Sequence, residues 1–236
     1  MAIFNSPFFE IDKSETKRYA GLRQSEFDEK IIEEACELAR LIIHPTGNWE
    51  IYDYDDKTQT ILSTPPFHIQ GESIKKHLKG CDKVVMLSAT VGQEIEEKIT
   101  SLFKEGKYAL SLILDAAATS AVEQNADLME KAIFEKVSRQ GYKMKWRFSP
   151  GYGDWPIEQQ PEMIRTSKAD IIGVHLTESM MLEPRKSITA IIGLYIIEEN
   201  CTNEAEKHNC AACDKTDCLA RKELASRAFK LYTFIM

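Results

Sequence analysis

The sequence predicts an α+β fold: a twisted, mostly antiparallel sheet with long helices packed on it, followed by a Cys-rich C-terminal appendage. Two observations lead to this class. Some stretches have the helical spacing of apolar residues and others have the short runs of strands, yet the two kinds do not alternate as regularly as in a doubly wound sheet. The 236 residues suit one large domain with a small addition, so we expect a domain over 1–199 and a cysteine-rich segment over 200–236.

The expected elements can be given in chain order. They are a helix over 12–19, a helix from Ser25 to about 43, a strand pair over 49–62, a helix over 72–78, a strand over 82–88, helices over 93–104 and 107–140, a strand over 144–149, a helix over 157–167 that Pro161 limits, and strands over 170–177 and 186–197.

Four of these elements carry specific expectations. Ser25 is a suitable N-cap for the second helix, and His77 is expected to be a solvated helix residue. The turn over 89–92 is either a plain strand–turn–helix link or an anion site at exposed N–H groups; no dinucleotide or P-loop fingerprint is present. In the longest helix, the small side chains of 116–121 let another element approach closely and would leave Glu123 half-buried.

Overall composition is that of a soluble globular protein, with 43% hydrophobic and 28% charged residues. A net charge of −7 argues against nonspecific binding of nucleic acid. No run approaches the roughly 20 apolar residues of a membrane-spanning helix, and residues 1–6 lack a charged n-region with an apolar stretch behind it. We therefore expect a cytoplasmic protein without a membrane partner.

The most informative stretch is 144–160, M-K-W-R-F-S-P-G-Y-G-D-W-P-I-E-Q-Q. Its first residues alternate, which predicts a strand with Met144, Trp146 and Phe148 on one face and Arg147 on the other. The Pro-Gly-Tyr-Gly corner that follows is typical of a tight turn.

Residues of this corner are suited to a small charged ligand. Gly151 and Gly153 permit positive φ and close backbone approach, so Tyr152 and Asp154 can point at a bound molecule. A guanidinium from Arg147 grips a carboxylate, an aromatic face attracts an onium group, and a carboxylate takes an ammonium or ribose hydroxyls. The alternative is an ordinary strand and a surface loop.

The six residues from Arg147 to Tyr152, R-x-x-P-G-Y, resemble the S-adenosylmethionine-binding signature of the activation domain of cobalamin-dependent methionine synthase. Two further segments resemble that family in the same order, V-E-Q-N-A-D-L-M-E-K over 122–131 and L-T-E-S over 176–179 with Pro184 behind it. Together they cover roughly 109–194. After Tyr152 the chain departs from the family's Pro-Ala-Cys-Pro, and its last forty residues do not match the family.

The resemblance implies S-adenosylmethionine as cofactor. Arg147 would grip its methionine carboxylate, Tyr152 and Glu123 would serve its sulfonium and ammonium end, and Gly151 would allow close approach. It also implies reductive remethylation of cob(II)alamin on a corrinoid partner such as methionine synthase, with a flavodoxin or ferredoxin as electron donor. The corrinoid is expected on the partner because no D-x-H-x-x-G motif is present.

Four cysteines near the C-terminal end follow the spacing C-x8-C-x2-C-x4-C, at Cys201, Cys210, Cys213 and Cys218. Such a group suggests a four-thiolate site for Zn²⁺ or an iron–sulfur cluster, although the spacing matches neither a common zinc finger nor a bacterial ferredoxin. Redox-active thiols and ordinary reduced cysteines remain alternatives. The sequence thus also allows a metal-binding or redox module, or a plain interaction protein, while a conventional methyltransferase is disfavoured because its glycine-rich first turn is absent.

Overall fold

The structure is a computed structural model that describes residues 3–7, 9–22 and 27–196. Its centre is a seven-stranded antiparallel sheet of order β4-β3-β2-β5-β9-β6, with β1 paired to β2, and a separate hairpin is formed by β7 and β8. The strands are β1 (Phe4–Asn5), β2 (Thr46–Asp55), β3 (Thr60–Ile61), β4 (Phe67–His68), β5 (Lys83–Thr90), β6 (Lys143–Met144), β7 (His175–Leu176), β8 (Leu182–Glu183) and β9 (Ser187–Tyr195). The predicted α+β class is confirmed.

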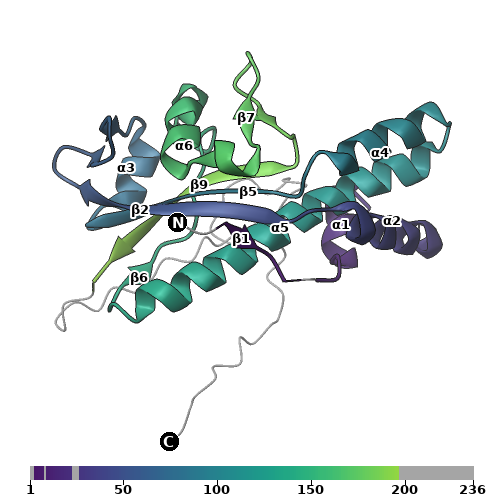
Figure 1. The fold of residues 1–236 in the computed structure, drawn as a ribbon, viewed down its shortest axis with the longest axis horizontal. Helices are drawn as coiled ribbons and strands as arrows, with labels where there is room; N and C mark the ends of the chain where they lie inside the picture. The colour runs from purple at the N-terminus through teal and green to yellow at the C-terminus, as the bar shows by residue number, and fades with distance from the viewer. Residues whose placement is uncertain (1–2, 8, 23–26, 197–236) are drawn as a thin grey trace, which may run out of the picture.

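Helices cover both faces of this sheet (Figure 1). They are α1 (Lys13–Tyr19), α2 (Glu29–Ile42), α3 (Glu72–Leu78), α4 (Glu94–Lys104), α5 (Tyr108–Ser138) and α6 (Gln160–Ser167), with 3₁₀ turns η1 (Ile157–Gln159) and η2 (Ala169–Ile172). The 31-residue α5 runs along one face, and α3 and α6 lie on the other. The first half of α5 extends past the sheet and packs with α1, α2 and α4.

Alternation along β5 explains why its sequence is apolar throughout. Val85 and Leu87 pack under α5 with Met129, whereas Val84 and Met86 pack on the opposite side beneath α3. Successive side chains of a strand point to opposite faces, so a strand covered on both sides must be apolar at every position. The buried strand predicted over 82–88 is therefore a central strand.

The small-residue portion of α5 acts as predicted. Ala117, Ala118 and Ala121 are fully buried in the cluster that joins α5 to α2 and α4. Side chains of one carbon let neighbouring helices pack closely, and burial of this face anchors the half of α5 that leaves the sheet. The residue that the sequence placed beside this portion, Glu123, is half-buried.

Two predicted boundaries were wrong. The second helix begins at Glu29 with Asp28 as N-cap, whose carboxylate accepts from the N–H of Lys30, and Ser25 lies outside the described residues. The strand predicted over 170–177 exists only as His175–Leu176, because the chain first makes the 3₁₀ turn η2. That turn closes at Gly173, whose φ is +73° and whose N–H donates to the carbonyl of Asp170.

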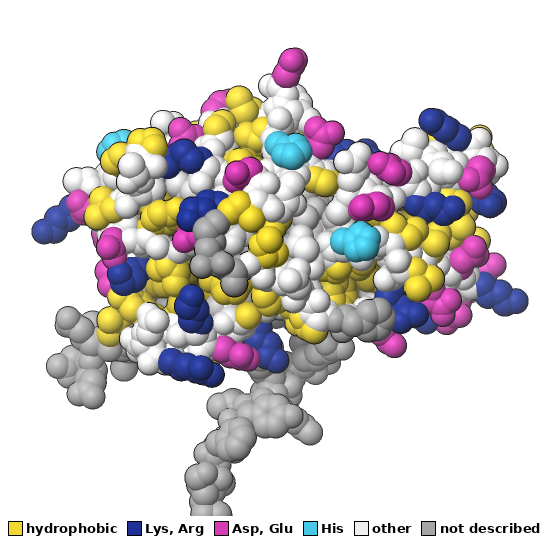
Figure 2. Space-filling view, viewed as in Figure 1, with side chains coloured by type: hydrophobic (Ala, Val, Ile, Leu, Met, Phe, Trp, Pro, Cys, Tyr) yellow, Lys and Arg dark blue, Asp and Glu magenta, His cyan; other side chains and the backbone are white. Residues whose placement is uncertain are grey.

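Charges on the face seen in Figure 2 are interspersed, with Lys and Arg next to Asp and Glu rather than in a stripe of one sign. Of the helices within the described residues, none has the length and apolar character that a membrane span requires. The segment 200–236, with its four cysteines, lies outside the described residues, so the structure does not test the predicted boundary at 199.

Candidate functional site

The strand predicted over 144–149 is regular only at β6 (Lys143–Met144), and Phe148 adds one isolated bridge, so the segment that carries Arg147 follows β9 through a β-bulge. Met144 pairs with Leu194 and Phe148 bridges to Ile191, so four steps along one strand face three steps along β9. One extra residue in one of two paired strands defines a bulge, which bends the strand and changes the direction of the side chains that follow.

Because of this bulge, the side chains of 144–148 do not alternate as predicted, and Arg147 is directed toward α5. Met144 packs on the α5 side, whereas Trp146 and Phe148 pack on the α3 side. The three were expected on one face, and the extra residue moves Met144 to the other. Arg147 points to the α5 side, away from its two aromatic neighbours. Bulges are common beside binding sites because they re-aim a side chain in this way.

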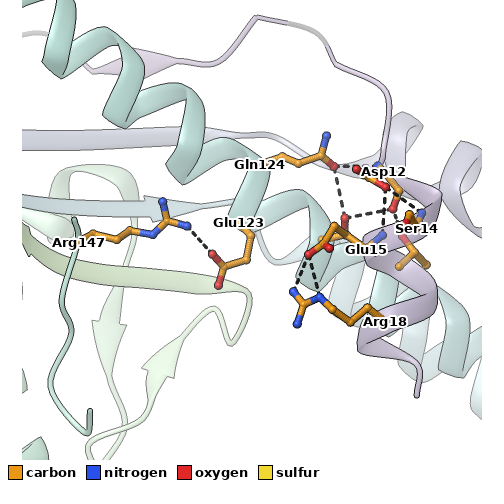
Figure 3. Close-up of polar contacts among 9 residues, drawn as sticks. Asp12, Ser14, Glu15, Arg18, Glu123, Gln124 and Arg147 are labelled. Atoms are coloured by element: carbon orange, nitrogen blue, oxygen red, sulfur yellow. Dashed lines mark hydrogen bonds and ion pairs between the residues drawn. The ribbon is translucent and has the colours of Figure 1, made fainter. Parts of the chain in front are cut away.

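On α5, three acidic residues surround the Arg147 guanidinium; we call Glu123, Asp127 and Glu130 the acidic cluster. Nη2 donates to Glu123 Oε2 at 2.6 Å and Nη1 donates to Asp127 Oδ1 at 2.6 Å (Figure 3 shows the first contact). Glu130 Oε1 lies 2.9 Å from Nη1 as an ion pair without hydrogen-bond geometry. The Arg147 side chain is only 17% exposed, so these contacts are made partly out of water.

Protonation of this cluster follows from burial and charge. Burial lowers the pKa of Arg147, but Glu130, Asp127 and Glu123 outweigh it and hold that pKa well above its ordinary value. Burial raises the pKa of Glu130, and repulsion from Asp127 and Glu123 raises it further. The Arg147 guanidinium lowers this pKa, but by less than the other effects raise it. Three carboxylates around one cation leave the site net negative, which favours a ligand that brings positive charge.

Tyr152 stands at the exposed edge of this site. Its side chain is 58% exposed, and its ring meets the edge of Phe148 at a centroid distance of 6.1 Å. Partial burial and the nearby charge of Glu123 raise the pKa of Tyr152, while Arg147 lowers it. The phenol is therefore neutral at physiological pH and lies within the electrostatic reach of both charged partners.

The corner that presents Tyr152 is a compact turn anchored by a buried tryptophan. The N–H of Gly151 donates to the carbonyl of Trp155 at 2.8 Å, and the N–H of Trp155 donates to the carbonyl of Tyr152 at 3.0 Å. Trp155 is 1% exposed, and its indole N–H donates to Gln159 at 2.7 Å. Gly151 has a φ of +88°, which a side chain would strain.

Asp154 lies at the end of this corner and faces α3. Its two carboxylate oxygens accept from the backbone N–H groups of Glu72 and Ser73, both at 2.8 Å. These bonds lower the pKa of Asp154. The structure therefore brings Arg147, Glu123 and Tyr152 together, while Asp154 turns toward the start of a helix; a direct contact of Asp154 with a ligand stays a prediction.

Two consecutive residues of α5, Glu123 and Gln124, contact different parts of the structure (Figure 3). Glu123 points to Arg147, whereas Gln124 points to α1, accepting from the N–H of Asp12 at 2.9 Å and donating to the carbonyl of Glu10 at 2.9 Å. The N-terminal segment is thereby fixed next to the candidate site.

Sequence reasoning missed most of the polar face along α5. Asp127 and Glu130 lie four and seven residues after Glu123, and helical periodicity places such positions on one face. Asp115 and Thr119 continue that face in the other direction, where both contact Lys186 Nζ at 2.9 Å. The signal was present, since Glu123 had been singled out and its neighbours at helical spacing are acidic.

The L-T-E-S segment forms the turn of the β7–β8 hairpin. Thr177 N–H donates to the carbonyl of Met181, and the Thr177 and Ser179 hydroxyls lie 3.0 Å apart. Within the described residues, no hydrogen bond or ion pair joins this turn to Arg147, so its part in a binding site stays a prediction.

Two grooves lie away from the site. One of about 590 Å³ separates α4 from residues 183–185, and one of about 740 Å³ lies beside β1 and β2. Neither is lined by Arg147, Glu123 or Tyr152. Within the described part of the chain, no group of His, Cys, Asp and Glu could hold a metal ion. The cysteines predicted to bind metal are outside that part.

Fold and site together define an α+β protein in which a bulged strand presents an arginine to an acidic helix. No protein-family model matches the sequence, and no curated protein matches it. Among solved structures, the fold is similar to that of the crystal structure of the MetH reactivation domain bound to AdoHcy, with a TM-score of 0.56. The match covers 87% of this chain and 81% of that one at 13% sequence identity, so the likeness concerns the fold. The resemblance inferred from sequence motifs thus extends to the architecture.

Proposed function

We propose that this protein binds S-adenosylmethionine beside Arg147 and supports the reductive remethylation of cob(II)alamin on a corrinoid protein such as cobalamin-dependent methionine synthase. One observation carries the proposal. Arg147 and Glu123 belong to two segments that resemble the activation domain independently, and the fold brings these residues, 24 positions apart, to 2.6 Å. The similar fold of a reactivation domain that binds AdoHcy adds support.

Chemically, the residues fit this ligand. S-adenosylmethionine carries a sulfonium and an ammonium against one carboxylate, so its net positive charge complements the net negative site. Two of the five N–H donors of Arg147 make hydrogen bonds to the acidic cluster, which leaves capacity for a ligand carboxylate. The exposed ring of Tyr152 offers a π-face to an onium group. The ligand supplies the methyl group, and this chain's part is to hold it against a corrinoid in the right orientation.

The direct test is calorimetric titration of S-adenosylmethionine into the full-length protein, prepared anaerobically. Arg147→Ala should weaken binding ten- to a hundredfold, because a charge-assisted pair is worth roughly 1.5–3 kcal/mol. Arg147→Lys should also weaken it, since an ammonium keeps the charge but loses the planar fork. Arg165→Ala is the matched control, because Arg165 bonds to the carbonyl of Thr64 at 3.1 Å. Equal affinity in all three variants would remove Arg147 from the site.

The four cysteines favour a second candidate, a metal-binding or iron–sulfur redox module. Four thiols in one short segment of the sequence are a chelating set, and a cluster there could supply the electron that remethylation requires. The two functions are compatible in one protein. Metal and acid-labile sulfide analysis of the anaerobically prepared protein tests the second candidate, because a chain that only binds S-adenosylmethionine would contain neither metal nor sulfide.

A further inference from the structure

Helix α3 is capped at its start by a residue of the turn that follows Arg147 in the chain. Gly71 occupies the N-cap position and supplies no side chain, so Asp154 caps the helix instead through the N–H groups of Glu72 and Ser73. The first N–H groups of a helix have no intrahelical partner, and a carboxylate there is favoured by hydrogen bonding and by the helix dipole. The corner that presents Tyr152 is thus tied to α3; we call residues 146–155 the corner segment.

Backbones meet directly at this end of the helix. A Cβ at Gly71 would lie 2.8 Å from the carbonyl oxygen of Asp154 and 3.0 Å from Cα of Trp155. A Cβ at Gly153 would lie 2.8 Å from Ser73 Oγ. Both contacts are closer than ordinary packing, and both glycines have positive φ. At Gly71 the opposing atoms are backbone, so the two backbones fit there only without a side chain, whereas at Gly153 the opposing atom belongs to the Ser73 side chain.

The other end of α3 holds the beginning of the corner segment through His77. Nε2 of His77 lies 2.9 Å from the carbonyl oxygen of Trp146, and its ring lies 4.3 Å from the Trp146 ring and 5.3 Å from the Phe148 ring. A carbonyl only accepts, so Nε2 carries the hydrogen. Trp146 and Phe148 flank Arg147, and His77 is half-buried among them rather than solvated, which corrects the sequence prediction.

We propose that α3 holds the binding site in place, with His77 and Asp154 as positioning residues that fix Arg147 and Tyr152 from the opposite side of the strand. We call this set of contacts between α3 and the corner segment the brace. The contacts at the two ends of α3 enclose the residues that carry the ligand-binding groups. Holding a charged side chain and an aromatic ring in place before binding reduces the ordering that binding requires. The proposal rests on the proposed function only for the identity of the ligand.

The first test compares ligand affinity in the full-length protein. His77→Ala should weaken S-adenosylmethionine binding about tenfold, while His77→Gln should restore most of the affinity because its amide N–H can donate to the same carbonyl. Lys76→Ala, on the exposed side of the same helix, should leave affinity unchanged. A His77→Ala protein that melts at a lower temperature but binds with unchanged affinity would overturn the proposal, since the contact would then be structural only.

A second test needs no ligand. Amide hydrogen exchange at Gly151 and Tyr152, on the far part of the corner segment, should accelerate in His77→Ala and stay slow in His77→Gln and Lys76→Ala. Unchanged exchange at these amides in His77→Ala would overturn the brace even if the protein binds S-adenosylmethionine. If the wild-type protein binds no S-adenosylmethionine while exchange accelerates as expected, the brace stands and the proposed function fails.

Discussion

At the scale of single residues, the site is an arginine with more acidic partners than it can neutralise. Asp127 is 60% exposed and keeps much of its hydration, whereas Glu123 and Glu130 are 33% and 27% exposed. The Arg147–Asp127 pair contributes less free energy than a fully buried pair, because water competes for the exposed Asp127 carboxylate. The half-buried Glu123 lies close enough to raise the pKa of Tyr152.

Tyr152 gives a prediction at this scale. If its ring face contacts the positive end of S-adenosylmethionine, Tyr152→Phe should lose less affinity than Tyr152→Ala, since the π-surface survives without the hydroxyl. Because the Tyr152 side chain is exposed, unfolding midpoints of both variants should stay close to wild type. Calorimetric titration measures the affinities. Equal losses in the two variants would show that the hydroxyl, not the ring, makes the contact.

The residues of the site could be found from sequence only in part. Arg147 and Glu123 were predicted from motifs and are in contact, and Tyr152 lies beside them. What sequence could not supply is direction: Asp154 stands two residues from Tyr152, yet its carboxylate caps a helix 82 positions away. The sequence alone does not distinguish a carboxylate that faces a ligand from one that caps a distant helix.

At the scale of elements, local patterns predicted local structure and failed where tertiary pairing decides. The helix over 72–78 was predicted with the bounds of α3, because its apolar residues Ile74 and Leu78 follow helical spacing. The bulge before Phe148 was not predictable, since the extra residue exists only relative to β9, some forty positions later. The prediction that His77 is a solvated helix residue was wrong for the same reason, because its aromatic neighbours Trp146 and Phe148 come from another part of the chain.

Packing of α3 leads to a prediction about pH. Burial lowers the pKa of His77 to about 4 from its ordinary 6.5, with Lys145 adding to the effect and the Trp146 carbonyl opposing it. A depressed pKa means that the unfolded chain takes up a proton below pH 6.5 while the folded chain does not until about pH 4. Stability from neutral His77 is therefore complete above pH 6.5 and is lost progressively as the pH falls toward 4, by at most about 3 kcal/mol.

Urea unfolding at pH 7, 5.5 and 4.5 measures this dependence. Wild type should lose more stability across the series than His77→Gln, whose amide does not titrate. Other groups titrate equally in both proteins, so the difference between them isolates His77. Parallel curves would mean that His77 takes up its proton as readily in the folded protein as in the unfolded chain.

At the scale of the whole molecule, the candidate site and the four C-terminal cysteines lie in separate parts of the sequence. Every contact that defines the site lies within 3–196, while Cys201, Cys210, Cys213 and Cys218 come after it. We therefore expect changing Cys210 and Cys213 to Ser to remove bound metal or cluster and leave S-adenosylmethionine affinity unchanged. Metal and sulfide analysis with calorimetry checks both parts. Metal-free, colourless wild-type protein that still binds its ligand would exclude the metal hypothesis.

The function of the whole molecule is tested only with a partner. No D-x-H-x-x-G motif is present in the sequence, and under the proposed function a partner protein supplies the corrinoid. Mixed with a corrinoid protein in the cob(II)alamin state, a reductant and S-adenosylmethionine, the chain should accelerate the formation of methylcobalamin, which absorbance follows over time. The acceleration expected is that of positioning two reactants in one complex.

Glu123→Gln provides the discriminating variant in this reaction. The substitution keeps the shape of the side chain and removes its charge, so it should slow methylation if that carboxylate helps to hold the positively charged cosubstrate. Glu33→Gln removes a carboxylate of the exposed ion pair with Lys13 at 2.8 Å and should have no effect. Since the half-buried Glu123 also pairs with Arg147, unfolding curves of both variants must first show folded protein. Methylation that proceeds equally fast without the chain, across several corrinoid partners and reductants, would leave the redox module as the better account.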